Sequence, residues 1–204
     1  MKRLLICAAL GAAVLPGCAD VGTEVRASNL PAAFGGERSY ELVRAPSQSD
    51  SPLQRQYEAL VRDELALHGF ASDGGARYLV SLAFDTRSAA VRVASGDCAH
   101  AAGGADAACG GPETAAPAWM WPGEHPFVHT LTLRFFERSS GREVYRVFAA
   151  SRGHDADPAR ASAYLVKSVF AQFPFADHEA WRVKLHPAEQ GAAPGIVSVK
   201  PLER

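Results

Sequence analysis

The chain has 204 residues, 48% of them hydrophobic, and its 21 Lys and Arg nearly balance its 22 Asp and Glu. This length and composition suit one globular domain with additional terminal segments. The formal net charge of −1 and the lack of a basic stripe in the sequence argue against nucleic acid as a partner.

Residues 1–17 have the composition of an export signal. Lys2 and Arg3 form a short positive region, and Leu4 to Leu15 form an apolar run of 12 residues. A helix of that length spans roughly 18 Å, well short of the ~30 Å hydrocarbon core of a membrane. We therefore expect a cleaved signal peptide over residues 1–17 rather than a transmembrane helix.

The four residues Leu15-Pro16-Gly17-Cys18 resemble a bacterial lipobox, in which the cysteine becomes the new N-terminus. The resemblance implies that Cys18 carries fatty acyl chains, and several chains together hold a protein at a membrane almost permanently. Ala19 stands where such proteins of the inner membrane commonly carry aspartate, which implies the outer membrane, facing the periplasm. The alternative is an ordinary signal peptidase that cuts after Ala19 and discards Cys18.

Three cysteines remain once the signal is removed, which are Cys18, Cys98 and Cys109. Lipidation of Cys18 leaves one pair in an oxidising compartment, so we predict a disulfide between Cys98 and Cys109. A bridge over a loop of this size contributes roughly 3 kcal/mol on the chain-entropy account. A metal site made by the same pair with His100 is the alternative, but it lacks a fourth ligand and close cysteine spacing.

The segments that flank the expected domain have no hydrophobic period. Residues 18–36 end in Gly35-Gly36, and we expect them to form a flexible tether that spans roughly 25 Å from the lipidated cysteine. A single domain is expected over residues 37–186, followed by a flexible tail over residues 187–204, where Gly and Pro recur.

The first half of the domain contains three expected elements. Alternating residues predict a strand over 38–43 and another over 76–85. Between them, a helical period runs over residues 52–68. Ser51 is suited to cap this helix, and Gln54 completes a capping box with it.

The second half predicts a hairpin, a helix and a last strand. Strands over 127–135 and 144–149 flank a turn at 139–141, a helix follows over 158–173, and 181–186 alternate as a strand. The expected fold is therefore α+β, a two-layer domain with the order β-α-β-β-β-α and a final β. We expect a four- to five-stranded sheet with the helices on one face.

A long loop over residues 94–126 interrupts the domain and is rich in Gly, Ala and Pro. Loops of this length inside a domain tend to be functional or disordered. The loop contains Trp119, Met120 and Trp121, which are candidate partner-binding residues because rigid aromatic side chains dock partners and membrane interfaces. The alternative is that both tryptophans fold back and cover the sheet.

Four segments together resemble a known family: "ERSYELVRAP…QYEALVRDELALHGF", "ARYLVSLAF", "LTLRFFERSSGREVYRVFAAS" and "LVKSVFAQFPF". They are similar to bacterial lipoproteins that carry the domain of unknown function 4136. The resemblance covers most of residues 37–186 and implies an envelope lipoprotein with a small α+β domain. It implies no activity, cofactor or catalytic residue.

The sequence contains neither a G-x-S-x-G nor an H-E-x-x-H motif. His154, Asp155 and Asp157 lie close together, and we interpret them as a polar turn in which Asp157 caps a helix, with a metal or acid–base site as the alternative. His129 falls on the apolar side of its strand, where a hydrogen-bonded, buried histidine is the usual arrangement and a ligand role is the alternative.

The sequence thus favours a membrane-anchored lipoprotein of the cell envelope that faces the periplasm and serves as a non-enzymatic binding or structural module. The alternative is a small periplasmic hydrolase or metal-dependent enzyme that uses the loop histidines. The two hypotheses differ in one structural respect. The enzyme requires His125 or His129 to meet a carboxylate in a pocket.

Overall fold

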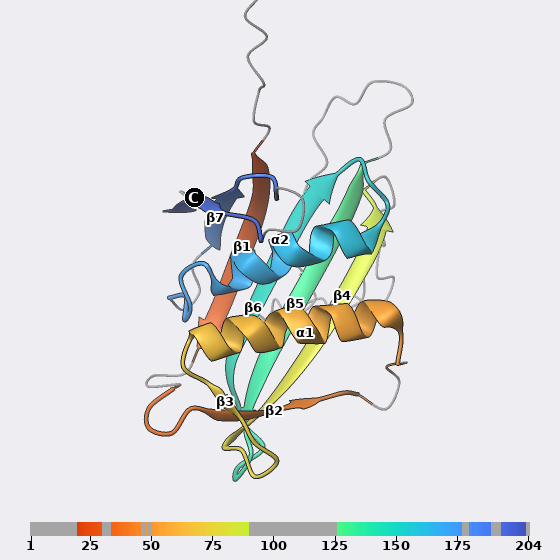
Figure 1. The fold of residues 1–204 in the computed structure, drawn as a ribbon. Helices are drawn as coiled ribbons and strands as arrows, with labels where there is room; N and C mark the ends of the chain where they lie inside the picture. Colours follow the sequence, from red (N-terminus) through yellow and green to blue (C-terminus); the bar gives the residue numbers. More distant parts are fainter. Residues whose placement is uncertain are drawn as a thin grey trace, which may run out of the picture.

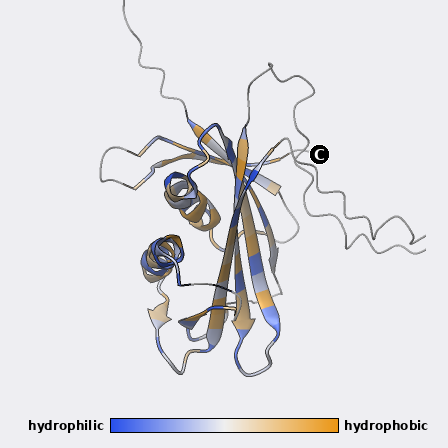
Figure 2. Ribbon diagram, turned by 90° about the vertical axis from the view of Figure 1, so that its right-hand side faces the viewer, coloured by the Kyte–Doolittle hydropathy of each residue, from blue (hydrophilic) through white to orange (hydrophobic). Residues whose placement is uncertain are grey.

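One eight-stranded mixed sheet, with two helices packed against one of its faces, makes up the fold (Figure 1). The computed structural model describes residues 20–29, 34–45, 48, 50–89, 126–176, 180–188 and 193–202. Viewed from the side, both helices lie on the same side of the sheet (Figure 2).

The strands are β1 (Val21–Asn29), β2 (Ser39–Val43), β3 (Ala71–Ser72), β4 (Tyr78–Ser88), β5 (Phe127–Glu137), β6 (Glu143–Gly153), β7 (Ala180–Leu185) and β8 (Ile196–Pro201). Helix α1 (Pro52–Leu67) lies between β2 and β3 in the chain, and α2 (Pro158–Phe170) lies between β6 and β7. Across the sheet the order is β3-β2-β4-β5-β6-β1-β7-β8. Strand β2 is parallel to β3 and β4, and every other neighbouring pair is antiparallel.

The fold is α+β, but the expected four- to five-stranded sheet is wrong, because the described sheet has eight strands. Seven expected elements have counterparts in the structure, which are β2, α1, β4, β5, β6, α2 and β7. The three strands that sequence reasoning missed are β1, β3 and β8.

Strand β1 corrects the expectation of a flexible tether over residues 18–36. Residues Val21–Asn29 pair with β6 on one side and with β7 on the other. Its inward side chains Thr23, Val25 and Ala27 are almost fully buried. Two of these three are small or polar, so the hydrophobic alternation that normally marks a strand is weak here.

Strand β8 corrects the expectation of a flexible tail over residues 187–204. It contains the β-branched residues Ile196, Val197 and Val199 and pairs with β7 at the edge of the sheet. Glycine and proline lie on either side of this short run, so the sequence of the whole segment is typical of a flexible tail. Strand β3 has only two residues, which is too short to show any period.

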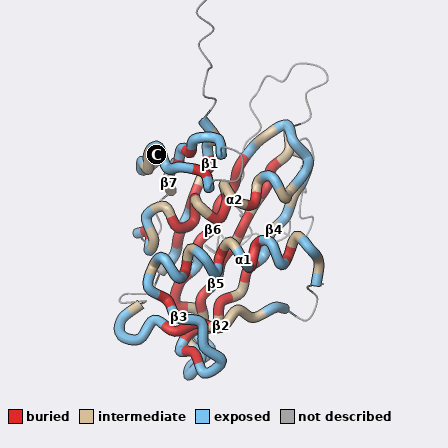
Figure 3. The backbone as a smooth tube through the Cα atoms, in the orientation of Figure 1, coloured by how far each residue is buried: buried red, intermediate tan, exposed pale blue. Residues whose placement is uncertain are grey.

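Ser51 and Asp157 cap their helices as the sequence predicts, but the Gln54 side chain donates to Glu58 at 2.8 Å and does not complete the expected capping box. The Ser51 hydroxyl accepts a hydrogen bond from the backbone N–H of Gln54 at 3.0 Å, and Asp157 accepts one from the N–H of Ala159 at 3.0 Å. Each cap is followed by proline at the start of its helix. Side chains of α1 and α2 then cover the sheet, and the central strands beneath them are buried (Figure 3).

An aromatic cluster fills the core at the level where β1 ends. Tyr145 of β6 lies opposite Asn29 of β1 and opposite Phe135 of β5. Phe34 packs into this cluster, although it also fell within the expected tether. Its ring centroid is 5.1–5.6 Å from those of five neighbours, which are Phe70, Tyr78, Phe135, Tyr145 and Phe173.

Candidate functional site

Strand β1 begins at one end of the sheet, which we call the N-terminal end. In the pairing register, Thr23 of β1 lies opposite Ser151 of β6 and Val183 of β7. Ser151 lies opposite His129 of β5, which in turn lies opposite Thr86 of β4. The starts of β1, β5 and β8 and the ends of β4, β6 and β7 therefore lie together at this end of the sheet.

The expected lipidation site, Cys18, lies outside the described residues, which begin at Asp20. Strand β1 starts at Val21, so only Ala19 and Asp20 separate Cys18 from the sheet. Three residue steps of extended chain reach at most about 10 Å. Any group attached to Cys18 is therefore held close to the N-terminal end, and the tether of roughly 25 Å expected from an eighteen-residue flexible segment does not apply.

The long loop expected over residues 94–126 connects two strands at this same end. The chain leaves at Ala89 and returns at Pro126, where the N–H of Ala89 donates to the carbonyl of Pro126 at 2.8 Å. The predicted disulfide and the predicted partner-binding residues stay predictions because they lie outside the described residues. These are Cys98, Cys109, Trp119, Met120 and Trp121, together with His100 and His125.

His129 lies at the N-terminal end, where it is buried on the helix side of the sheet. Its Nε2 lies 2.8 Å from the backbone carbonyl oxygen of Asp155, and its Nδ1 lies 2.9 Å from the Thr86 hydroxyl. A carbonyl oxygen only accepts, so Nε2 carries a hydrogen and donates it to Asp155, while Nδ1 shares a hydrogen bond with the Thr86 hydroxyl. Both ring nitrogens are thus occupied by groups that are not carboxylates, which suits a structural histidine rather than a general base.

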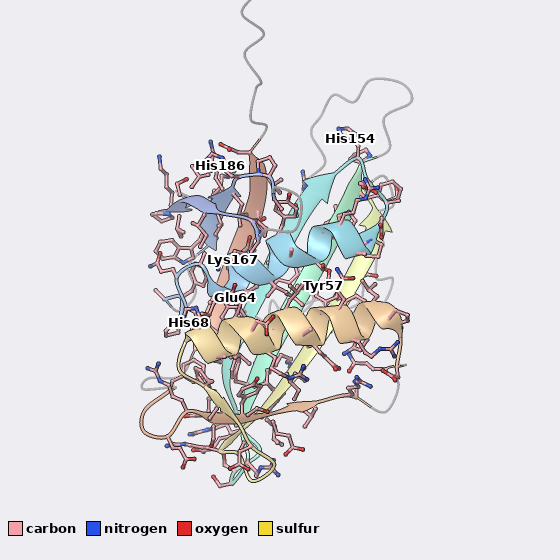
Figure 4. All side chains as sticks on the ribbon, viewed as in Figure 1. Tyr57, Glu64, His68, His154, Lys167 and His186 are labelled. Carbon is pink, nitrogen blue, oxygen red and sulfur yellow. The ribbon has the colours of Figure 1, made fainter. Side chains whose placement is uncertain are left out.

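The turn before α2 uses its acidic residues in local structure. Asp157 caps α2, and Asp155 accepts a hydrogen bond from the backbone N–H of Asp157 at 2.9 Å. Asp155 also pairs with Arg160 at 3.0 Å. The predicted polar turn with an Asp157 cap is confirmed. His154 lies at the N-terminal end, as does His186 at the other side of the sheet (Figure 4).

His186 contacts the first described residue of the chain. Its Nδ1 lies 3.2 Å from a carboxylate oxygen of Asp20. This contact joins the segment that leads from Cys18 into β1 to the residue that follows β7. It shows that the chain is already held against the sheet at Asp20.

A second polar group joins the two helices. Lys167 of α2 donates to the Glu64 carboxylate of α1 at 2.8 Å, and His68 lies beside them, stacked on Phe170 (Figure 4). Burial lowers the pKa of His68. The opposite charges of Glu64 and Lys167 neutralise one another, so this group serves helix packing. Within the described residues, no cluster of His, Cys, Asp and Glu is arranged to hold a metal ion.

The sheet face opposite the helices, which we call the open face, carries a concentration of positive charge. Successive residues of a strand point to opposite faces of the sheet. The buried strand residues face the helices, so the residues directly before and after them in the sequence face the open side. Four acidic side chains lie there, Glu24, Glu41, Asp85 and Glu143. Eight basic side chains lie there: Arg26, Arg87, Arg134, Arg146, Arg152, Arg182, Lys184 and Lys200.

Sequence reasoning missed the open face because each strand contributes only one or two of these basic residues. Their alternation with buried residues was visible locally, as for Arg182 and Lys184 around Val183. The basic residues gather only when β1 and β8 join the sheet on either side of β7. The pairing of β1 with residues more than a hundred positions away carries no local signal.

The structure defines an α+β domain in which a mixed sheet carries two helices on one face and a basic open face. The family model described as domain of unknown function (DUF4136) matches residues 24–175, and the chain belongs to that family. The match begins inside β1, which agrees with β1 being part of the domain rather than a tether. No functionally curated protein matches the sequence.

The solved structures that match this chain are only distantly similar to it. The PelC dodecamer from Paraburkholderia phytofirmans is 14% identical with a TM-score of 0.43, and the match covers 72% of this chain and 96% of that chain. A PDZ domain protein from Parabacteroides distasonis is 9% identical with a TM-score of 0.47. That match covers 82% of this chain and 40% of that chain.

Proposed function

We propose that this protein is a lipoprotein of the cell envelope, anchored through acyl chains on Cys18, with its domain facing the periplasm as a non-enzymatic binding or structural module. The observation that carries the proposal is the sequence Leu15-Pro16-Gly17-Cys18 at the end of an apolar run that follows Lys2 and Arg3. This pattern resembles a lipobox, and Ala19 in the next position favours the outer membrane.

The fold supports this proposal through the short distance between Cys18 and the sheet. Strand β1 is paired on both sides, so a lipid on Cys18 fixes the whole domain to the membrane surface through three residue steps. Neither described helix is long and apolar enough to cross a membrane.

A binding or structural role is favoured over hydrolysis by the surroundings of His129. The enzyme hypothesis needs His125 or His129 to meet a carboxylate in a pocket. His125 lies outside the described residues, and both His129 nitrogens are occupied by Thr86 and the Asp155 backbone. The other polar groups at the N-terminal end cap α2 or form local ion pairs. The described residues thus give no specific support to a catalytic site.

The anchor is tested by growing cells that express the protein in labelled palmitate. We expect label on the wild-type protein and none on a Cys18→Ala variant. A Cys7→Ala variant is the matched control, because Cys7 lies inside the signal and its loss leaves the lipobox intact. A wild-type protein without label would show that the lipoprotein assignment is wrong and that cleavage after Ala19 is the better account.

A further inference from the structure

Three basic side chains of β7 and β8 gather on the open face. Arg182 of β7 lies directly opposite Lys200 of β8, and Lys184 lies two residues further along β7 on the same face. All three side chains are exposed. We call Arg182, Lys184 and Lys200 the basic corner.

The charge of the basic corner is not balanced by neighbouring acids. Glu24 lies opposite Arg182. Its Oε1 atom, however, already contacts the Arg26 guanidinium, 2.8 Å from Nε and 2.6 Å from Nη2. Among the described residues, no ion pair involves Arg182, Lys184 or Lys200. Like charges placed directly opposite each other destabilise an antiparallel pair. The Arg182–Lys200 pair therefore does not itself stabilise the contact between β7 and β8.

Arg26, Arg134 and Arg146 of the open face differ in this respect. Arg134 and Arg146 face each other across β5 and β6, and both donate to Glu143, at 2.6 and 2.7 Å. Their charges are shared with an acid on the same face. The basic corner is a part of the open face where three neighbouring charges are left available for a partner.

An exposed apolar tip lies next to the basic corner. Ile196 and Val197, at the start of β8, are 41% and 43% exposed, and both are large hydrophobic residues. Ile196 lies opposite Leu185 of β7, which lies opposite Val21 of β1. The tip therefore lies at the N-terminal end, in the same row of the sheet as the first residue of β1.

The tip and the basic corner both lie near Cys18. Val21 is three residue steps from Cys18, a reach of at most about 10 Å. Glu24, Arg182 and Lys200 form a row across the sheet that lies three residues further along β1. At the rise of a strand, this row is another ~10 Å from Val21. When the open face lies along the membrane, side chains in both rows come within reach of the surface that holds Cys18.

We propose that the basic corner and the Ile196-Val197 tip form a contact surface for anionic phospholipid. The cations bind headgroup phosphates, and the apolar tip enters the boundary between headgroups and acyl chains, a combination typical of interfacial membrane contacts. This inference rests on the proposed function, because the lipid on Cys18 brings the surface to the membrane. Each basic residue near an anionic surface strengthens binding about fivefold.

The test uses the mature chain, residues 18–204, with Cys18→Ser so that no acyl chain contributes. It is sedimented with vesicles of phosphatidylcholine, with and without phosphatidylglycerol. We expect binding to the anionic vesicles that weakens in high salt. The Arg182→Gln/Lys184→Gln/Lys200→Gln variant should bind roughly a hundredfold more weakly, given about fivefold for each basic residue. An Ile196→Ser/Val197→Ser variant should also bind more weakly.

The matched control is Arg55→Gln/Arg62→Gln/Arg142→Gln, which removes the same charge from exposed positions on α1 and the β5–β6 turn. Its affinity for anionic vesicles should stay within about threefold of the parent's. Its arginines act only at long range, and salt screens such interactions beyond a Debye length near 8 Å. Circular dichroism confirms folding, and the basic-corner variant should be no less stable than its parent because like charges are removed.

Three outcomes would overturn the inference. They are no binding of the parent chain to anionic vesicles, equal binding of the basic-corner variant, and binding to a soluble anionic polysaccharide without binding to vesicles. The last outcome would assign the basic corner to an anionic polymer. Because the tested chain cannot be acylated, its vesicle binding is independent of the palmitate experiment, so failure of the anchor and failure of the lipid contact are distinguishable.

Discussion

The ring of Phe34 lies 5.2 Å from that of Phe135, edge to face at 76°. These two residues are a hundred positions apart in the chain, and Phe34 follows β1 in a segment whose sequence had the features of a linker. Edge-to-face pairs of this kind add stability beyond the area they bury. The contact shows that Phe34, which follows β1, packs against the core.

Phe34→Ala should therefore lower the free energy of unfolding by about 2–3 kcal/mol, below the full cost of a buried Phe→Ala change because Phe34 is partly exposed. The measurement is urea denaturation followed by circular dichroism. Leu67→Ala is the control, since Leu67 is 75% exposed and should change stability by less than about 0.5 kcal/mol. Equal stability of Phe34→Ala and the wild type would contradict the observed packing.

Glu58 should make stability depend on pH. The Arg44 guanidinium donates to both of its carboxylate oxygens, from Nε to Oε1 at 2.5 Å and from Nη2 to Oε2 at 2.7 Å. These hydrogen bonds lower the pKa of Glu58. The stabilisation is therefore present above the unfolded pKa of about 4.3 and is lost as pH falls through the lower folded pKa.

We expect Glu58→Gln to cost about 1–2 kcal/mol at pH 7, less than a fully buried pair because the Arg44 side chain is 36% exposed. The difference from wild type should shrink below about pH 4. Denaturation across a pH series measures it, with the exposed Asp63→Asn as control. A difference that stays constant from neutral to acid pH would show that Glu58 does not act through its charge.

His129 should behave as a structural residue. His129→Leu leaves the part-buried Asp155 carbonyl and Thr86 hydroxyl without their partner and removes a buried side chain that fits its site. An unsatisfied group costs about 1–3 kcal/mol where water cannot reach it. We therefore expect a loss of roughly 2–4 kcal/mol in thermal or urea unfolding. The exposed His154→Ala is the control and should stay within about 0.5 kcal/mol of wild type. An equally stable His129→Leu variant would reopen a ligand role for His129.

The short connection to Cys18 should control how closely the domain contacts the membrane. Twelve Gly and Ser residues inserted between Ala19 and Asp20 would add a flexible span of roughly 20 Å. In the acylated protein reconstituted into anionic vesicles, we expect faster amide hydrogen exchange in β7 and β8 and an unchanged thermal midpoint. The same residues appended after Arg204 are the control. Exchange that does not respond to the insertion would contradict direct contact.

Elements with a local signal were predictable from the sequence. Ser51 and Asp157 each precede a proline, and both helices begin at those prolines. The β5–β6 hairpin follows from its alternation and its turn. Strand β1 was not predictable in this way, because its inward residues Thr23 and Ala27 are weakly hydrophobic and its partners lie far along the chain.

The candidate site was predictable only in part. The N-terminal pattern around Cys18 is local and points to an anchor, but the distance between that anchor and the domain depends on where the first strand begins. The basic corner requires β7 and β8 to be neighbours, which no local pattern specifies. The interpretation of Asp157 as a helix cap was correct because capping is itself a local interaction.

Strand β1 also determines how the domain would respond to mechanical load. It is hydrogen-bonded on both sides, to β6 and to β7, and both neighbours run antiparallel to it. A pull on the N-terminus acts along the strand axis, so the hydrogen bonds of both ladders share the force and must slide together rather than open one at a time. A domain attached through this strand would therefore resist detachment from its attachment point by shear.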